Sequence, residues 1–174
     1  MAEPQTPDLP ENQLAPLHVF RFDVSFTRAT LPGAAAQPAS DVPLCSGAFA
    51  ECTGLEATME PKVIKAGGTN YGAAQRVGPV TFATVVLKRG MTSTRDLWQW
   101  FQTVGGGGYS YRLNVRITMQ SHAGEPVVTW VLDRALPVKF KAADLNATGT
   151  AIGIEELHLA HEGLRLEMPG AGAA

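Results

Sequence analysis

The sequence predicts a mainly β protein, an antiparallel β-sandwich or partial barrel with one flanking α-helix. Several segments alternate apolar and polar residues with a period of two, which is the pattern of strands buried on one face. Turns are well supplied, because the 174 residues include 18 glycines and 12 prolines. One segment carries a clear helical pattern, and a single helix cannot cover both faces of a sheet. The strands must therefore pack against one another.

The strands are expected throughout the chain. The first spans residues 17–26, where Phe20, Phe22, Val24 and Phe26 share one face. The further strands expected are two runs within 47–68 on either side of a turn near Glu60 and Pro61, one over 80–90, one over 109–120, its hairpin partner over 127–135, a short one within 136–150, and a long one over 151–167.

The last of these strands changes phase along its length. Ile152 and Ile154 share one parity, and the two leucines of "LHL" have the opposite one. A bulge near Glu155 or Glu156 would explain the shift.

The helix is expected between residue 93 and a run of four glycines at 105–108. Ser93 and Asp96 have the spacing of a capping box, a hydroxyl followed three residues later by a carboxylate. Leu97, Phe101 and Val104 fall on one helical face, with Trp98 beside them and Trp100 toward the flank. The glycines tolerate the left-handed geometry with which many helices end.

The chain divides into three parts. We expect a flexible N-terminal arm over 1–16, one β domain over 17–167 and a flexible C-terminal tail over 168–174. Within the domain, 27–45 has three prolines and no clear period, which predicts a long loop. The segment 66–78 predicts a glycine-rich loop.

Composition excludes several classes. The net charge of −2, with only 17% charged residues, argues against the basic surface of a nucleic-acid binder. No run of 18 apolar residues predicts a membrane span, and the N-terminus has neither the basic nor the apolar part of a secretory signal. Cys45 and Cys52 are interpreted as two buried or half-buried thiols, with a disulfide as the alternative. Two cysteines alone do not make a metal site.

Motifs for chemistry are weak throughout. "AGGTNYG" and "VGGGGYSY" lack the Gly-Lys-Ser/Thr ending of a phosphate-binding loop, and no Gly-x-Ser-x-Gly elbow occurs. In "ELHLAHE", His158 and His161 would point to opposite faces of a strand, as would Glu155 and Glu156. We therefore expect no catalytic, cofactor-binding or metal-ligating residues, and an assembly or binding role in place of an enzyme.

The order of several motifs carries a resemblance. "ECTGLEATMEPKVIKAGGTNYG", "VTFATVVLKRGMTSTRDLWQWF" and "LPVKFKAADLNATGTAIGIEELHLAHEGLRLE" follow one another between about Phe20 and Glu167. In this order they resemble the tail tube (inner tube) protein family of contractile phage tails and phage-tail-like contractile injection systems. Each short motif is weak alone, and the combination is specific.

The resemblance implies a structural role. Six copies would form a ring whose strands join into one continuous lumen-lining β-barrel, and the rings would stack into a rigid hollow tube. A contractile sheath would drive this tube through a target envelope. The implied partners are further copies of the chain, a sheath protein, baseplate or spike and tube-terminating proteins, and a cargo effector or DNA in the lumen. Assembly would take place in the cytoplasm. The protein would then be part of a phage tail or of an injection particle, including particles released from the cell.

Two sets of residues stand out as candidates. The structural helix anchor is expected to be Leu97, Trp98 and Phe101. The candidate inter-subunit or inter-ring loop consists of Gly67, Gly68, Thr69, Asn70, Tyr71 and Gly72, with a plain surface loop as the alternative. Two other functions stay open: a tube-initiating, baseplate-proximal relative of the tube protein, suggested by the long loop at 27–45, and a ligand-binding β-sandwich module.

Overall fold

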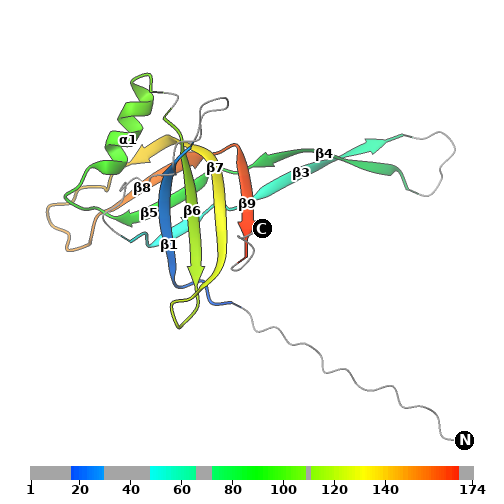
Figure 1. The fold of residues 1–174 in the computed structure, drawn as a ribbon. Helices are drawn as coiled ribbons and strands as arrows, with labels where there is room; N and C mark the ends of the chain where they lie inside the picture. Colours follow the sequence, from blue (N-terminus) through cyan, green and yellow to red (C-terminus); the bar gives the residue numbers. More distant parts are fainter. Residues whose placement is uncertain (1–16, 30–47, 66–71, 109–110, 169–174) are drawn as a thin grey trace, which may run out of the picture.

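The computed structural model describes residues 17–29, 48–65, 72–108 and 111–168. These residues form nine strands and one helix, and every strand pair is antiparallel (Figure 1). The mainly β fold with one helix is therefore confirmed. In chain order, the elements are β1 (Phe22–Arg28), β2 (Glu51–Thr53), β3 (Ala57–Ile64), β4 (Ala74–Phe82), β5 (Val85–Gly90), α1 (Asp96–Gly105), β6 (Leu113–Gln120), β7 (Pro126–Lys141), β8 (Ile154–Ala160) and β9 (Gly163–Glu167).

Two sheets share one long strand. The first sheet has the order β1-β6-β7-β9, and the second has the order β7-β8-β5-β2. The first half of β7 pairs with β6 and β9, and its last residues pair with β8. At the crossing Arg134 has a φ of 51°, and its N–H donates to Oδ1 of Asn114 at 3.0 Å. A bulge held by a side chain therefore bends the strand from one sheet into the other.

β1 and β6 begin later than predicted, at Phe22 and Leu113. In three stretches the chain is also divided into strands differently from the sequence predictions. The runs expected at 127–135 and within 136–150 are one strand, β7, because the bulge bends the chain without ending its pairing. The run expected over 80–90 is two strands, β4 and β5, separated at Ala83 and Thr84. The long strand expected over 151–167 is also two strands, β8 and β9.

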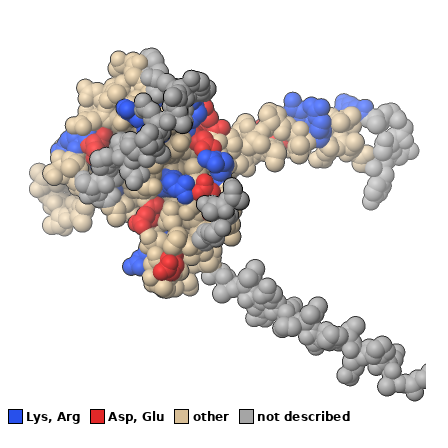
Figure 2. All heavy atoms as spheres, in the orientation of Figure 1, with Lys and Arg blue, Asp and Glu red and all other residues tan. Residues whose placement is uncertain are grey.

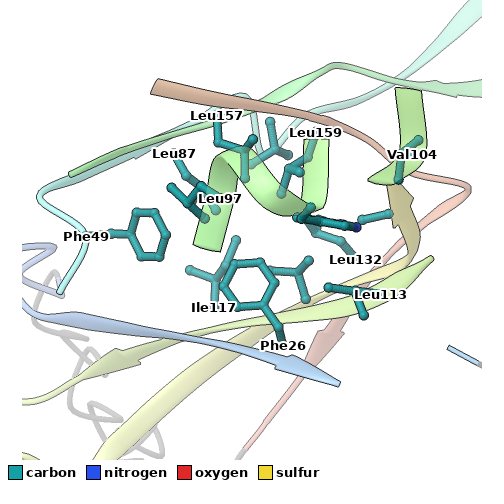
Figure 3. Close-up of a cluster of buried hydrophobic side chains, with 14 residues drawn as sticks. Phe26, Phe49, Leu87, Leu97, Val104, Leu113, Ile117, Leu132, Leu157 and Leu159 are labelled. Carbon is teal, nitrogen blue, oxygen red and sulfur yellow. The ribbon is translucent and has the colours of Figure 1, made fainter. Parts of the chain in front are cut away.

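The core lies between the two sheets and beneath the helix (Figure 3). At its centre the rings of Phe26 from β1 and Trp100 from α1 meet nearly edge to face, with centroids 5.9 Å apart. The core consists of Phe26, Phe49, Val85, Leu87, Leu97, Trp100, Val104, Leu113, Val115, Ile117, Leu132, Ala135, Leu157 and Leu159. The alternation in β5, β6 and β8 buries every second residue over most of each strand, as a strand period of two requires.

A long hairpin, β3–β4, projects from the body, and we call it the arm (Figure 1). The turn expected near Glu60 and Pro61 is wrong, because β3 runs through both residues and accommodates them with a register shift. The loop expected over 66–78 is shorter than predicted, because β4 already begins at Ala74.

A glycine fixes the root of the arm. Gly54 lies between β2 and β3 with a φ of +86°, in the left-handed region that favours glycine. A Cβ added there would also overlap the carbonyl oxygen of Thr84, on the chain that leads from β4 into β5. The backbone at Gly54 and at Thr84 therefore lies too close together at the root of the arm to admit a side chain.

The helix starts later than predicted. It begins at Asp96, and Arg95 occupies the N-cap position without a side-chain hydrogen bond to the helix. The capping box expected from Ser93 is therefore wrong. Instead the Asp96 carboxylate accepts the N–H of Leu97 at 3.1 Å. The helix ends at Gly105, within the predicted glycine run, and Gly107 has a φ of +106°.

Several expected segments fall partly or wholly outside the described residues. The flexible N-terminal segment expected over 1–16 lies outside them, as does all of the C-terminal tail beyond Met168. The loop expected over 27–45 begins later than predicted, since Thr27 and Arg28 belong to β1. Its remaining residues from 30 onward lie outside the described part of the chain.

Candidate assembly site

The helix anchor is built differently from the prediction. Leu97 is buried, but Trp98 is 44% exposed, and Trp100, at 3% exposed, occupies the core position expected for Trp98. The buried face of α1 is Leu97, Trp100 and Val104, a spacing of three and four residues. The later start of the helix does not alter this face. The sequence pattern does not separate the two tryptophans, because they lie on either side of the face that Leu97, Phe101 and Val104 share.

Trp98 and Phe101 form a second contact with the sheet. Their rings lie 5.7 Å apart, and the Trp98 ring meets Phe140 of β7 edge-on at 5.4 Å. The side chains of Leu97 and Trp100 enter the core beside this contact. The helix is thus held to the sheets by a buried face and by a half-exposed aromatic group at its rim.

A buried ion network, missed from the sequence, joins the helix to the second sheet. Arg89 of β5 is 1% exposed, and its Nε donates to Oε1 of Glu155 on β8 at 2.5 Å. Its Nη2 donates to Oδ1 of Asp96, the first residue of α1, at 2.6 Å. Arg89 and Glu155 are directly opposite each other in the β5–β8 register. One guanidinium therefore fixes two strands and the helix start relative to one another.

The same network explains the phase change in the last segment. The register between β5 and β8 runs unbroken from Ile154 to Leu159, so the bulge predicted at Glu155 or Glu156 is wrong. Glu155 instead lies on the face of β8 that is turned toward the core, while Ile154 is exposed on the other face. The sequence did contain a signal for this pair. Arg89 and Glu155 each stand two residues from a buried leucine, at a position where the strand alternation calls for an apolar residue.

The arm presents two different faces. By the register, Met59 and Val63 of β3 share one face with Val77 and Val80 of β4, and all four are exposed. The opposite face is mixed: Lys62 and Arg76 lie on it together with Glu60 and the exposed Ile64. Figure 2 shows Lys and Arg spheres along the outer half of the arm. A single chain gains nothing by holding a row of apolar side chains in water. The arm is therefore a surface suited to contact with another molecule.

The candidate glycine-rich loop falls between β3 and β4 in the sequence. Gly67, Gly68, Thr69, Asn70 and Tyr71 are outside the described residues. Gly72 is described; it is exposed, and its φ is +76°. The role predicted for the loop stays a prediction.

The outward face of the first sheet is polar and charge-balanced. Arg165 of β9 donates through Nε and Nη2 to the two carboxylate oxygens of Asp133 at 2.8 and 2.7 Å. Glu162 accepts from Arg112 and from Arg134 at 2.6 and 2.7 Å. Figure 2 shows the two signs of charge intermixed on the body. Such a face is well suited to water or to a polar partner.

Both sheets end in open edges. Among the described residues, β1 pairs only with β6, β9 only with β7, and β2 only with β5. An unpaired strand edge offers free backbone donors and acceptors that another chain can pair with.

The thiols and histidines show no assembled chemical site. Burial raises the pKa of the half-buried Cys52 thiol to about 11, and Cys45 lies outside the described residues. The Nδ1 atom of His161 lies 2.8 Å from the carbonyl oxygen of Gly163, and its ring packs on Phe82 at the arm root. Across the described ranges, no three His, Cys, Asp or Glu side chains gather in a way that could hold a metal ion. Within the same ranges, no helix has the length and apolar character needed to cross a membrane.

Comparison with known proteins gives one consistent result. The family of the T4-like virus tail tube protein gp19 matches residues 18–165. Among curated proteins, none matches the chain significantly.

Solved structures share this fold over nearly the whole chain. A chain of the six-fold symmetrised baseplate of the anti-feeding prophage is 27% identical, with a TM-score of 0.73, covering 90% of this chain and 99% of that one. A chain of the extended sheath–tube complex of the PVC extracellular contractile injection system is 18% identical, with a TM-score of 0.68, covering 88% and 92%. A chain of the PVC sheath/tube terminator is also 18% identical, with a TM-score of 0.69, covering 89% and 99%.

Proposed function

The chain belongs to the family of T4-like virus tail tube proteins, and we propose that it forms hexameric rings that stack into the hollow inner tube of a contractile injection machine. The observation that carries the proposal is the arm, which holds an exposed apolar face away from the body. In a tube, a neighbouring copy would cover that face. The function is mechanical, and no catalytic step is part of it.

Ring closure is supported by the open sheet edges. A head-to-tail contact between identical copies closes into a ring when its rotation fits a whole number of copies. If an edge strand of one sheet pairs with the other edge strand of the same sheet in the next copy, that sheet continues around the ring and neither of its edges remains exposed. A polar outward face, such as that of the first sheet, would then line the lumen, as a water-filled channel requires.

The wider assembly follows the same proposal. The similar PVC chain comes from a sheath–tube complex, which supports a sheath as the partner outside the tube. The similar anti-feeding prophage chain comes from a baseplate, which supports baseplate and spike proteins as partners at one end. We place assembly in the cytoplasm, with a cargo effector or DNA in the lumen, in a phage tail or a released injection particle.

Electron microscopy tests the proposal. Purified chain, negatively stained over a range of concentrations, should show rings with a central hole and stacks of these rings. Single rings that never stack at any concentration would instead favour the tube-initiating position beside the baseplate. A monomer at every concentration, alone and mixed with its sheath protein, would contradict the proposal.

A further inference from the structure

We infer that the arm of one copy docks, through its basic face, into a pocket at the far end of the second sheet of the next copy along the stack. This inference rests on the proposed tube. The pocket, which we call the loop pocket, has a volume of about 280 Å³ and lies between the segment 142–153 and the start of β8. Its lining includes Lys141, Asp144, Asn146, Ile152, Ile154 and Glu156.

The arm and the loop pocket lie at opposite ends of one strand. The arm leads directly into β5, since β4 ends at Phe82 and β5 begins at Val85. The other end of β5, Gly90, pairs with Ile154, which lines the pocket. Figure 1 shows the arm on one side of the body and the connection from β7 to β8 on the other. An arm therefore cannot reach the pocket of its own chain, and only a second copy can bring the two together.

This placement favours stacking over any two-fold pairing. The two surfaces differ and face opposite ways, so each copy offers an arm to one neighbour and a pocket to the next. Contacts of this kind repeat without limit unless they close on themselves. The ring is proposed to close through the sheet edges. The contact between an arm and a loop pocket, which lie at the two ends of β5, is therefore the contact that would join one ring to the next.

The basic face of the arm carries two basic side chains, Lys62 and Arg76, against one acidic side chain, Glu60. Lys62 and Arg76 are directly opposite each other across the hairpin, and both are exposed. Like charges in this position destabilise a hairpin. Neither side chain forms an ion pair with another described residue. The arm therefore presents a concentrated positive charge that an acidic site would stabilise.

The loop pocket has the complementary chemistry. Asp144 is exposed and forms no ion pair with another described residue, whereas Glu156 already lies 3.9 Å from Nζ of Lys141. The Asn146 amide side chain adds a polar group beside these carboxylates, although its Oδ1 accepts from Thr148. A guanidinium pairs with a carboxylate through two parallel hydrogen bonds. Asp144 is thus the group that we assign to Arg76 of the next copy.

The apolar rim of the pocket suits the rest of a basic side chain. Ile152 is exposed beside the pocket. Long basic side chains bury their methylene stems on apolar surface while the charged end stays in a polar site. The opposite, apolar face of the arm remains available to the neighbouring copy proposed above, so the arm would lie between two copies.

A charge swap tests this contact. Arg76→Asp and Asp144→Arg should each lower the fraction of protein that pellets as stacked tubes by at least tenfold, because the penalty recurs at every copy of a ring. Single rings should persist in both variants. The chain that carries both changes should recover stacking to within about threefold of the unmodified chain. Glu125→Arg changes the charge by the same amount as Asp144→Arg at an exposed position in the β6–β7 turn, so it is the matched control for that variant and should stack normally.

The outcomes separate the two proposals. Normal stacking of Asp144→Arg, or a doubly changed chain that stacks no better than the single variants, would overturn the docking while leaving the tube intact. An unmodified chain that forms no rings would overturn the proposed function, and the docking with it. Circular dichroism of each variant excludes unfolding as the cause of lost stacking.

Discussion

Replacing Trp100 with alanine should destabilise the chain far more than the same change at Trp98. Trp100 is 3% exposed, so nearly all of its surface is buried, whereas Trp98 is 44% exposed. An aromatic side chain buries roughly 150–250 Å², which at about 25 cal/mol per Å² corresponds to about 4–6 kcal/mol. Measured losses for buried Trp→Ala changes are about 3–5 kcal/mol. We expect a loss in that range for Trp100→Ala and about 2 kcal/mol for Trp98→Ala, which loses about half as much buried area.

Unfolding in urea, followed by circular dichroism, measures the two free energies. All chains should be compared at one low concentration, because assembly would add stability by mass action. A difference of about 2 kcal/mol corresponds to a Tm difference of about 4–8 °C for a chain of this size. The two tryptophans belong to one helix and differ by two positions, so each serves as the matched control for the other.

Two results would refute the reasoning. Equal losses for Trp98→Ala and Trp100→Ala would mean that burial does not decide the contribution of each ring. A larger loss for Trp98→Ala would place that ring in the core, as the helix anchor expected from the sequence does, and would contradict the observed orientation of α1.

Three further predictions follow from the described residues. Glu155→Ala should lower the free energy of unfolding by about 3 kcal/mol because Arg89 loses a buried partner, and the double change Glu155→Leu with Arg89→Met should lose less in the same urea titration. Gly54→Ala should abolish stacked tubes in electron micrographs and speed hydrogen exchange in the arm while β5–β8 stays protected; unchanged tubes would show that the arm root tolerates a side chain. Folded Cys52 should resist iodoacetamide at pH 8. Because its thiol stays protonated to a higher pH in the folded than in the unfolded state, the free energy of unfolding should fall as the pH rises from about 9 through 11. Cys52→Ala should remove that fall, and a variant that shows the same fall as the unmodified chain would contradict the prediction.

The sequence predicts those parts of the fold that depend on a local period. The alternation in Leu113–Gln120 marks β6 with its buried face, and the glycine run marks the end of α1, since these signals depend only on neighbouring residues. The break between β4 and β5 escapes prediction because Val80–Phe82 and Val85–Gly90 form one continuous β-branched stretch. Only the direction of the arm in space separates them.

The candidate site is less accessible from the sequence because it depends on contacts between distant residues. Arg89 and Glu155 are 66 residues apart, and each resembles a surface charge until the β5–β8 register brings them together. The choice between Trp98 and Trp100 depends on which face of the helix meets Phe26, which no local pattern states. Within the arm the sequence predicts a turn near Glu60 and Pro61 and a loop over 66–78, because proline and glycine, which usually mark turns, stand inside β3 and β4.

A cryo-electron microscopy reconstruction of assemblies formed by the full chain tests most directly whether copies bind one another through the arm. We predict rings of six copies around an open lumen, with each arm in contact with the density of another copy and none free in solvent. Assemblies in which the arms contact no neighbouring copy would contradict this prediction, as would a chain that stays monomeric at the highest concentration it reaches.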